Sequence, residues 1–395
     1  MRVLIGDETG LLKSVELEKN EQHVISSRLE PQARRHAVQS MCWYEDENQL
    51  AGCKENVVVA RGDGVVESYS TSHGRTATTS SRDANWSFTS PAGKSVGVGM
   101  IQKFGSVVRC TDTGDVYVKN TLSESAKPAT FSVGPDIVRM RIEPTQQTHI
   151  AVGGKERDLS IWSLEKQEAV FKAKNVTHDT LDMRVPVWVK DVHFLSQGSS
   201  NGFRAVVGTG YQHVRIYDTN TKRRPVQEIK FGEYPVNALC VSPDETSVFV
   251  ADTAGNLDIL DLRMLKHQGR CTGPVGAIRD LACHPTLPYI AAVGLDRMVH
   301  VFNVNTRKYQ HMVYVKQRVN TVVFCDDGLK DLPTPVEEPS AKKRKTDDDE
   351  DFGLDDEDDE EAYEGLELSD NEYDNDEDDD EDDDDDGMEH DDDSE

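Results

Sequence analysis

The sequence predicts an all-β protein built as a seven-bladed β-propeller, and two observations carry this prediction. One unit recurs seven times between residues 1 and 325: a short apolar run, a tight polar turn and a second apolar run. Where the second run is clearest, apolar and polar residues alternate with period two, which is the pattern of half-buried strands. The alternative is an all-β sandwich with coincidental spacing. Seven units favour the propeller, because radial repetition shields strand edges.

The tight turns divide the chain into units. Glycine, asparagine and aspartate recur in them, and these residues adopt the positive φ of hairpin turns at the least steric cost. Successive turns are about 54, 50, 44, 55, 43 and 42 residues apart. A four-stranded WD40 unit takes about 40–45 residues, so three intervals contain insertions. The seven turns are residues 7–10, 62–64, 112–114, 155–158, 210–213, 252–256 and 295–297.

Four of the second runs end in a dipeptide at the place where WD40 units carry Trp-Asp. The runs are residues 159–163, 214–218, 257–261 and 299–303, and they end in Trp-Ser, Tyr-Asp, Leu-Asp and Phe-Asn. The alternation and these endings together predict a propeller of the WD40 type.

The two ends of the predicted propeller complete one blade. The first unit starts with residues 3–5 and 11–12, so it lacks an innermost strand. Residues 319–324 form an unassigned apolar run after the seventh unit. We expect this run to supply the missing strand, which would tie the ends together and end the domain near Cys325.

The negative charge belongs to the C-terminal part of the chain. The net charge is −29, and residues 346–395 contain 33 Asp or Glu and no Lys or Arg. Residues 1–345 therefore contain 40 acidic and 44 basic residues, a net of +4. We expect residues 346–395 to be a disordered acidic tail, because repelling charges without apolar side chains cannot offset the ordering entropy. Residues 326–340 are rich in Pro and Glu and are typical of a linker, which we expect to cover residues 326–345.

A basic tetrad ends this linker. Four consecutive cations in exposed chain resemble a monopartite nuclear import signal. The alternative is a local counter-charge to the acidic tail. The tetrad is Lys342, Lys343, Arg344 and Lys345.

Nothing in the sequence indicates catalysis. It has no phosphate-binding loop, dinucleotide fingerprint, nucleophile elbow or zinc-protease motif, and no Cys/His spacing typical of zinc. His284 precedes Pro285 and is interpreted as a turn residue. The seven cysteines are odd in number and mostly flanked by apolar residues, which favours buried, reduced thiols. No apolar run approaches the ~18 residues of a membrane span. We expect a soluble intracellular protein that is not an enzyme and has no cofactor or metal.

Basic residues concentrate between residues 153 and 230. This stretch contains 13 Lys or Arg and 9 Asp or Glu. It favours either a face that binds RNA or acidic proteins, or ordinary solvated loop charges. The insertion after Phe171 is too long for a hairpin and too apolar for a free loop, so it docks on its own domain or on a partner. We favour the partner.

Several segments of this region carry a more specific resemblance. They are Gly-Gly-Lys-Glu at 153–156, Phe-Lys-Ala-Lys-Asn-Val at 171–176, Leu-Asp-Met-Arg-Val-Pro-Val-Trp at 181–188, Gly-Thr-Gly-Tyr-Gln-His at 208–213, Arg-Arg-Pro-Val at 223–226 and Gly-Glu-Tyr-Pro at 232–235. With them, residues 1–325 resemble the family of WD repeat-containing protein seventy-four and the yeast Nop-seven-associated ribosome assembly factor.

The resemblance implies a function. It implies a nucleolar ribosome biogenesis factor of the pre-60S particle that binds other assembly factors and is needed for large-subunit maturation and rRNA processing. It also implies release by an AAA-type ATPase of the nuclear valosin-containing-protein-like kind, and links to an exosome-associated RNA helicase and rRNA. The candidate partner-binding residues are Lys155, Arg157, Lys172, Lys174, Asn175, Arg184, Trp188, Tyr211, Arg223, Arg224 and Tyr234.

Two other functions remain open. Residues 260–263, Leu-Asp-Leu-Arg, approximate the ending that cullin-RING ubiquitin ligases read on substrate receptors, with Leu in place of Trp. The acidic tail is compatible with a histone chaperone, because polyanions bind basic proteins.

Overall fold

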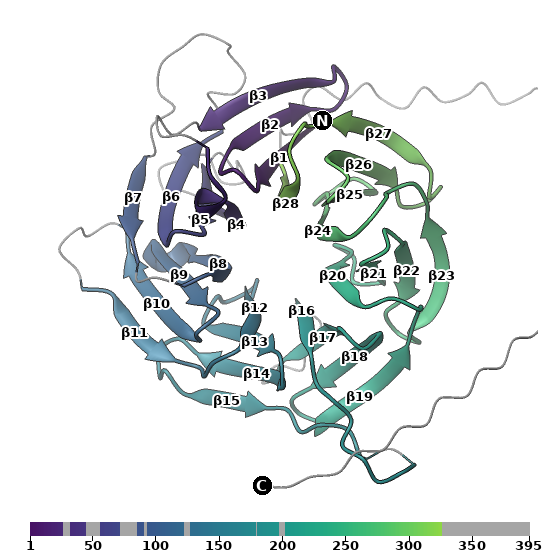
Figure 1. The fold of residues 1–395 in the computed structure, drawn as a ribbon. Helices are drawn as coiled ribbons and strands as arrows, with labels where there is room; N and C mark the ends of the chain where they lie inside the picture. Colours follow the sequence, from purple (N-terminus) through teal and green to yellow (C-terminus); the bar gives the residue numbers. More distant parts are fainter. Residues whose placement is uncertain are drawn as a thin grey trace, which may run out of the picture. The chain divides into compact units, whose positions relative to one another are not determined.

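The structure, a computed structural model, describes residues 1–26, 32–44, 56–71, 85–90, 93–121, 127–178, 180–196 and 202–325. Within these ranges the chain forms seven four-stranded antiparallel sheets arranged around a central axis (Figure 1). Two short 3₁₀ turns, η1 (Arg34–His36) and η3 (Gln102–Phe104), accompany the strands. The prediction of a seven-bladed β-propeller is confirmed. The predicted linker, the basic tetrad and the acidic tail lie outside the described residues.

Each blade runs from an inner strand at the axis to an outer strand at the rim. Blade 1 consists of β28 (Val319–Phe324), β1 (Arg2–Asp7), β2 (Leu12–Glu16) and β3 (Glu21–Ser26). Blade 2 consists of β4 (Val38–Tyr44), β5 (Asn56–Arg61), β6 (Val65–Ser70) and β7 (Trp86–Thr89). Blade 3 consists of β8 (Ser95–Ile101), β9 (Ser106–Thr111), β10 (Asp115–Asn120) and β11 (Ala129–Ser132).

The other four blades follow in chain order. Blade 4 consists of β12 (Ile137–Ile142), β13 (His149–Gly154), β14 (Arg157–Ser163) and β15 (Ala169–Lys172). Blade 5 consists of β16 (Val189–Leu195), β17 (Arg204–Thr209), β18 (His213–Asp218) and β19 (Lys222–Lys230). Blade 6 consists of β20 (Val236–Val241), β21 (Ser247–Asp252), β22 (Leu257–Asp261) and β23 (Lys266–Cys271). Blade 7 consists of β24 (Ile278–Cys283), β25 (Tyr289–Gly294), β26 (Met298–Asn303) and β27 (Tyr309–Tyr314).

The last strand closes the ring, as the sequence predicted. β28 pairs antiparallel with β1, and Phe324 lies opposite Val3. A neighbouring blade fixes β28 as well: Asp280 of β24 accepts hydrogen bonds from the Val322 N–H at 3.1 Å and the Thr321 hydroxyl at 2.8 Å. Both ends of the domain are therefore held in one sheet and anchored to the next.

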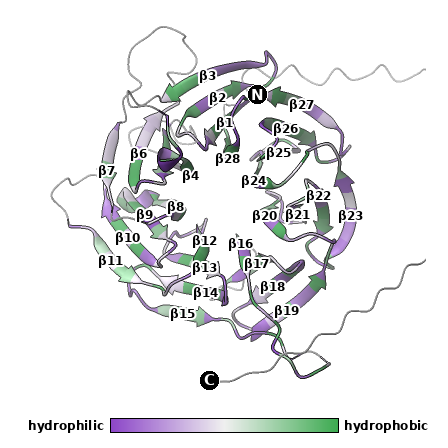
Figure 2. Ribbon diagram, in the orientation of Figure 1, coloured by the Kyte–Doolittle hydropathy of each residue, from purple (hydrophilic) through white to green (hydrophobic). Residues whose placement is uncertain are grey.

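The hydrophobic core is distributed between the blades. Each of the seven interfaces between neighbouring blades contains its own cluster of buried apolar side chains. Figure 2 shows hydrophobic colour concentrated toward the axis, whereas β19 and β23 at the rim are largely hydrophilic. Close approach between blades depends on glycine in two second strands: a Cβ on Gly153 would lie 2.5 Å from Val189, and one on Gly208 would lie 2.7 Å from Val236.

All seven inner strands share one irregularity. The register against the second strand shifts near the start of each inner strand, so that one residue is skipped, as in a β-bulge. The skipped residues are Gln39, Val96, Val138, Lys190, Asn237, Arg279 and Asn320.

The cysteines and His284 behave as predicted where the structure describes them. The six described cysteines are free thiols, four of them buried; Cys53 lies outside the described residues. The ring of His284 accepts hydrogen bonds from the backbone N–H groups of Leu287 at 3.0 Å and Thr286 at 3.2 Å. His284 therefore stabilises the turn between β24 and β25.

We predict that ring closure decides stability. A chain ending at residue 317 lacks β28 and exposes the apolar edges of blades 1 and 7, so it should lose cooperative thermal unfolding followed by circular dichroism. A chain ending at residue 345 should melt within about 2 °C of the full chain, because it keeps every described contact. Cooperative unfolding of the shorter chain at the same temperature would contradict the role assigned to β28.

Candidate functional site

The insertion predicted as a partner-binding element connects β15 of blade 4 to β16 of blade 5. Its first half lies along the start of β19, where Figure 1 shows the chain projecting beyond the rim. The Lys174 N–H donates to the Arg223 carbonyl at 2.8 Å, and the Arg223 Nε donates back to the Lys172 carbonyl at 2.8 Å. The Arg224 Nε donates to the Asn175 carbonyl at 3.1 Å. Five predicted residues, Asn175 included, thus form one cluster that spans two blades.

The second half of the insertion is fastened to the blade turns. The Val187 carbonyl accepts the Glu156 N–H at 2.8 Å, and the Trp188 carbonyl accepts the Gly210 N–H at 2.8 Å. Lys155 and Trp188 form an isolated β-bridge. Within the insertion, the side-chain amide of Asn175 donates to the Val185 carbonyl at 2.6 Å. The segment therefore docks on its own domain at both ends, as one of the two sequence interpretations expected.

The tip of the insertion still faces outward. Leu181 is 74% exposed and Met183 is 58% exposed. Arg184 approaches Glu156 at 3.1 Å, but both side chains are more than half exposed. Such a surface pair contributes only ~0–1 kcal/mol, so the Arg184 guanidinium can exchange partners at little cost. A braced segment thus presents two apolar side chains and a cation to the outside.

Aromatic side chains flank the same segment. Tyr211 packs edge-on against Trp188 with ring centroids 6.2 Å apart, and the Lys190 ammonium lies 4.1 Å from the centre of the Trp188 ring. Tyr234 is 47% exposed and Arg157 packs over Gly134. The structure brings the other nine predicted residues into one connected surface on blades 4 and 5, which we call the insertion surface. It consists of Lys155, Lys172, Lys174, Asn175, Arg184, Trp188, Tyr211, Arg223 and Arg224.

An ionic cluster in the central channel was not predicted from the sequence. Arg139 of β12 donates to buried Asp191 of β16 at 2.9 and 3.2 Å and lies 3.5 Å from Asp280 of β24. Arg141 lies 3.5 Å from Asp191 and 3.9 Å from Asp280. Asp191 also accepts the Leu239 N–H at 3.0 Å. This cluster connects blades 4, 5, 6 and 7 across the axis.

Two members of the cluster, Asp191 and Arg139, have shifted pKa values that favour their charged forms. Burial alone would raise the pKa of Asp191, but Arg139 and Arg141 hold that pKa well below its usual range. The pKa of Arg139 is raised: burial opposes the charge, and Asp191 and Asp280 outweigh it. Beside them, burial and the charge of Arg141 lower the pKa of His193 from 6.5 to about 3. His193 is therefore neutral at physiological pH.

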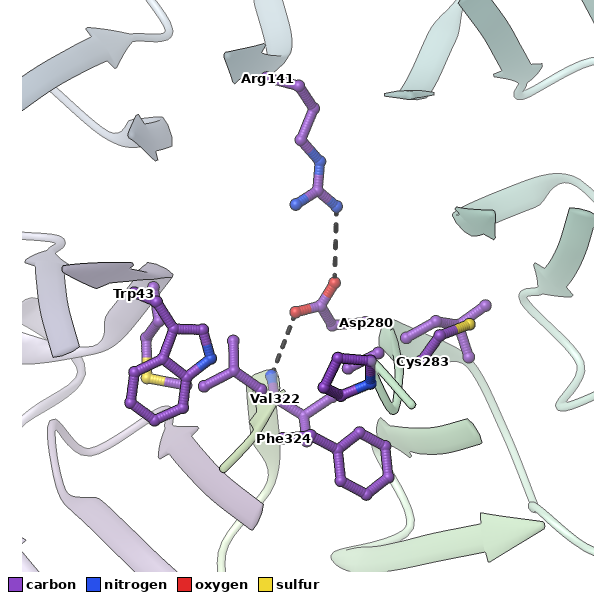
Figure 3. A pocket seen from close by; sticks show the side chains of 11 residues that line it. Trp43, Arg141, Asp280, Cys283, Val322 and Phe324 are labelled. Carbon is purple, nitrogen blue, oxygen red and sulfur yellow. Dashed lines mark hydrogen bonds and ion pairs between the residues drawn. The ribbon is translucent and has the colours of Figure 1, made fainter. Parts of the chain in front are cut away.

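One mouth of the channel contains a cavity of about 230 Å³. Figure 3 shows Asp280 between Arg141 and the backbone of Val322, with Trp43, Cys283 and Phe324 around them. The carboxylate is occupied by its Arg partners and by β28, so it is structural. Within the described ranges no group of three or more His, Cys, Asp or Glu residues is placed to hold a metal ion. Nor does any helix there have the length and apolarity of a membrane span.

The sequence contains a signal for the ionic cluster, but the signal is visible only when the seven blades are aligned on their inner-strand bulges. The residue after each inner-strand bulge is Ser40, Gly97, Arg139, Asp191, Ala238, Asp280 or Thr321. Charged residues in an otherwise apolar inner strand are expected to have partners, but only the ring brings these partners together.

Comparisons with known proteins agree with this architecture. The family model described as "WD domain, G-beta repeat" matches residues 265–303, which contain β23 to β26. WD repeat-containing protein 74 of Homo sapiens is 36% identical over 345 residues, covering 86% of this chain and 85% of that protein. The protein of the same name from Bos taurus is 35% identical with the same coverage. The chain belongs to the WD repeat-containing protein 74 family.

A more distant relative carries a functional name. Ribosome biogenesis protein nsa1 of Schizosaccharomyces pombe is 25% identical over 373 residues, covering 87% of this chain and 93% of that protein.

We predict that Asp191→Ala destabilises this family member by about 3–5 kcal/mol, because it leaves Arg139 buried with half of its counter-charge. The free energy of unfolding in urea at pH 7 measures the effect. Glu165→Ala removes an exposed carboxylate in the turn after β14 and should change stability by less than about 0.5 kcal/mol. Equal values for the two variants would show that the channel cluster contributes nothing.

We also predict a pH dependence from His193. Because its pKa is lowered in the folded state, the unfolded chain takes up the proton first, and stability is lost as pH falls from 6.5 toward 3. Urea unfolding at pH 7.5 and at pH 5 gives the free energy of unfolding at each pH. The decrease in this free energy between the two should be about 1 kcal/mol smaller in His193→Gln than in the unsubstituted chain. His178→Gln, at an exposed position, should reproduce the unsubstituted profile.

Proposed function

We propose that this chain is a ribosome biogenesis factor that works as a non-enzymatic scaffold. The family membership and the functional name of the S. pombe relative support this role. The single structural observation that carries it is the insertion surface, where a segment docked on two blades presents exposed apolar and cationic side chains. Rigid presentation limits the entropy lost on binding.

The insertion surface divides into anchors and contacts. The backbone of Lys172 and Lys174 holds the segment on β19, while both side chains are exposed. Leu181, Met183 and Arg184 extend from the tip. Assembly factors of the nucleolar pre-60S particle are the proposed partners, and rRNA phosphates would meet the same cations.

Three further parts of the proposal concern release from the particle, a nearby RNA helicase and nuclear import. An AAA-type ATPase of the nuclear valosin-containing-protein-like kind would remove the propeller, and an exosome-linked RNA helicase would act near it. The tetrad Lys342–Lys345 would direct import into the nucleus and nucleolus. These parts rest on the family resemblance and on the basic sequence of the tetrad.

The residues on which the cullin-RING alternative depends have a structural role in this propeller. Leu260 is fully buried, and the Asp261 carboxylate accepts the N–H groups of Arg263 at 2.7 Å and Met264 at 3.1 Å. This Asp261 contact stabilises the turn between β22 and β23. Affinity purification separates the functions: large-subunit precursor RNA and assembly factors support the proposal, whereas a cullin adaptor or histones alone would contradict it.

We predict that Lys172→Glu, Lys174→Glu and Arg184→Glu together weaken association with pre-60S particles by about tenfold, equivalent to ~1.4 kcal/mol. The reversed charges repel acidic partners or phosphates, while the backbone anchors remain. Sucrose-gradient co-sedimentation measures the association, and circular dichroism checks the fold.

A matched control reverses three exposed lysines away from the insertion: Lys166, Lys266 and Lys308. This variant has nearly the same net charge and should co-sediment normally. Equal retention of both variants on the particle would remove the insertion surface from the proposed interface.

A further inference from the structure

The second mouth of the channel holds a cavity of about 470 Å³. It lies where the seven inner strands begin, because all seven bulge residues line it: Gln39, Val96, Val138, Lys190, Asn237, Arg279 and Asn320. A bulge re-aims the skipped side chain out of the sheet. The ring thus directs one side chain from every blade to a common point, which we call the bulge cavity.

The bulge cavity is strongly cationic. Lys190 and Arg279 are joined in its wall by Arg34 and Lys94, and Glu8 is the only carboxylate among its lining residues. Within the described ranges none of these four cations makes an ion pair, whereas Glu8 lies 3.9 Å from Arg318. Arg139 closes the floor with its charge directed to Asp191. The cavity therefore has an excess of positive charge that the described chain does not neutralise.

This arrangement disfavours the charged forms of two of the cations, Lys190 and Arg279. Burial lowers the pKa of Lys190, and the nearby Lys94 ammonium lowers it further. Burial also lowers the pKa of Arg279; Glu8 opposes this effect and Arg318 adds to it. A negatively charged ligand would relieve the repulsion between these groups, since low-dielectric walls strengthen the attraction.

The lining selects one class of ligand. Sites for single-stranded nucleic acid usually provide aromatic faces on which bases stack, and no aromatic residue lines this cavity. The neighbouring Trp188 is covered by Lys190 and Tyr211. The amides of Asn237 and Asn320 donate to the carbonyls of neighbouring inner strands at 2.6 and 2.8 Å, and Asn320 accepts from Arg279. The Gln39 amide lines the cavity with the cations. Carboxylates fit this set, because they accept hydrogen bonds from ammonium, guanidinium and amide groups alike.

We propose that the bulge cavity is a binding site for an acidic peptide segment, whose Asp or Glu carboxylates enter the channel mouth between Arg34, Lys94, Lys190 and Arg279. The occupant is an acidic segment of a partner protein, because its charge is complementary to that of the cavity. Lys190 connects the site to the insertion surface, because its ammonium lies 4.1 Å from the centre of the Trp188 ring. The inference does not rest on the proposed function.

Fluorescence anisotropy of a labelled peptide tests the site. The probe has the sequence of residues 374–386, and the protein is the chain ending at residue 345, which keeps all described blades. We expect the triple variant Lys94→Gln, Lys190→Gln, Arg279→Gln to bind at least about tenfold more weakly, or ~1.4 kcal/mol. The matched variant Lys166→Gln, Lys266→Gln, Lys308→Gln removes the same charge elsewhere and should bind normally.

Three outcomes overturn the proposal: equal weakening in both triple variants, no binding to the unsubstituted chain, or tighter binding of a poly-uridine oligonucleotide that depends on the same three residues. Thermal unfolding of each variant shows whether the ring is intact. If the triple variant fails to fold, Lys94→Gln alone replaces it, because this position is exposed. This single variant should lose part of the affinity for the peptide.

The full-length chain provides the last check. The added peptide should bind it as tightly as it binds the chain ending at 345, because the proposed occupant is a segment of a partner. Weaker binding to the full chain, with the difference absent in the cavity variant and present in the control variant, would overturn the assignment to a partner.

Discussion

The rest of the structure depends on the pairing of β28 with β1. These strands come from opposite ends of the domain, and their register places Phe324 against Val3 and Val322 against Ile5. A blade that lacks its inner strand cannot bury the apolar faces of its two neighbours. Closing blade 1 therefore completes two of the seven interblade clusters, those against blades 7 and 2. Asp280 adds a fixed point, because it holds the backbone of β28 from blade 7.

Inside the closed ring, charged side chains from different blades meet in the central channel. Arg139 reaches two carboxylates from two other blades, and Asp191 in turn accepts a backbone N–H from β20. Burying an isolated ion is costly, so these groups are stable together and costly to separate. The cluster fixes the relative positions of blades that are not adjacent. The apolar packing between blades acts only on neighbours.

The insertion surface and the bulge cavity share one structural origin. β16 starts at the channel mouth, and the insertion is the segment that leads into it. Lys190 therefore lines the cavity while its ammonium packs on Trp188 of the insertion surface. A ligand in the cavity and a partner on the insertion would contact neighbouring residues of one chain segment. In the scaffold that we propose, two chemically different sites would lie on one support.

The sequence by itself determined the repeat, the strand alternation and the completing role of residues 319–324, because periodicity and turn residues are local properties that each blade repeats. It also located the basic and aromatic residues of the insertion, since their spacing departs from the repeat. Only the tertiary structure decided that Arg223 and Arg224 brace the insertion through their Nε atoms. The same holds for the Arg139–Asp191 pair and for the seven bulge residues at one mouth. The three hydrogen-bonded pairs are 49–52 residues apart in the chain, and the bulge residues come from seven different blades. Only closure of the ring makes these groups neighbours.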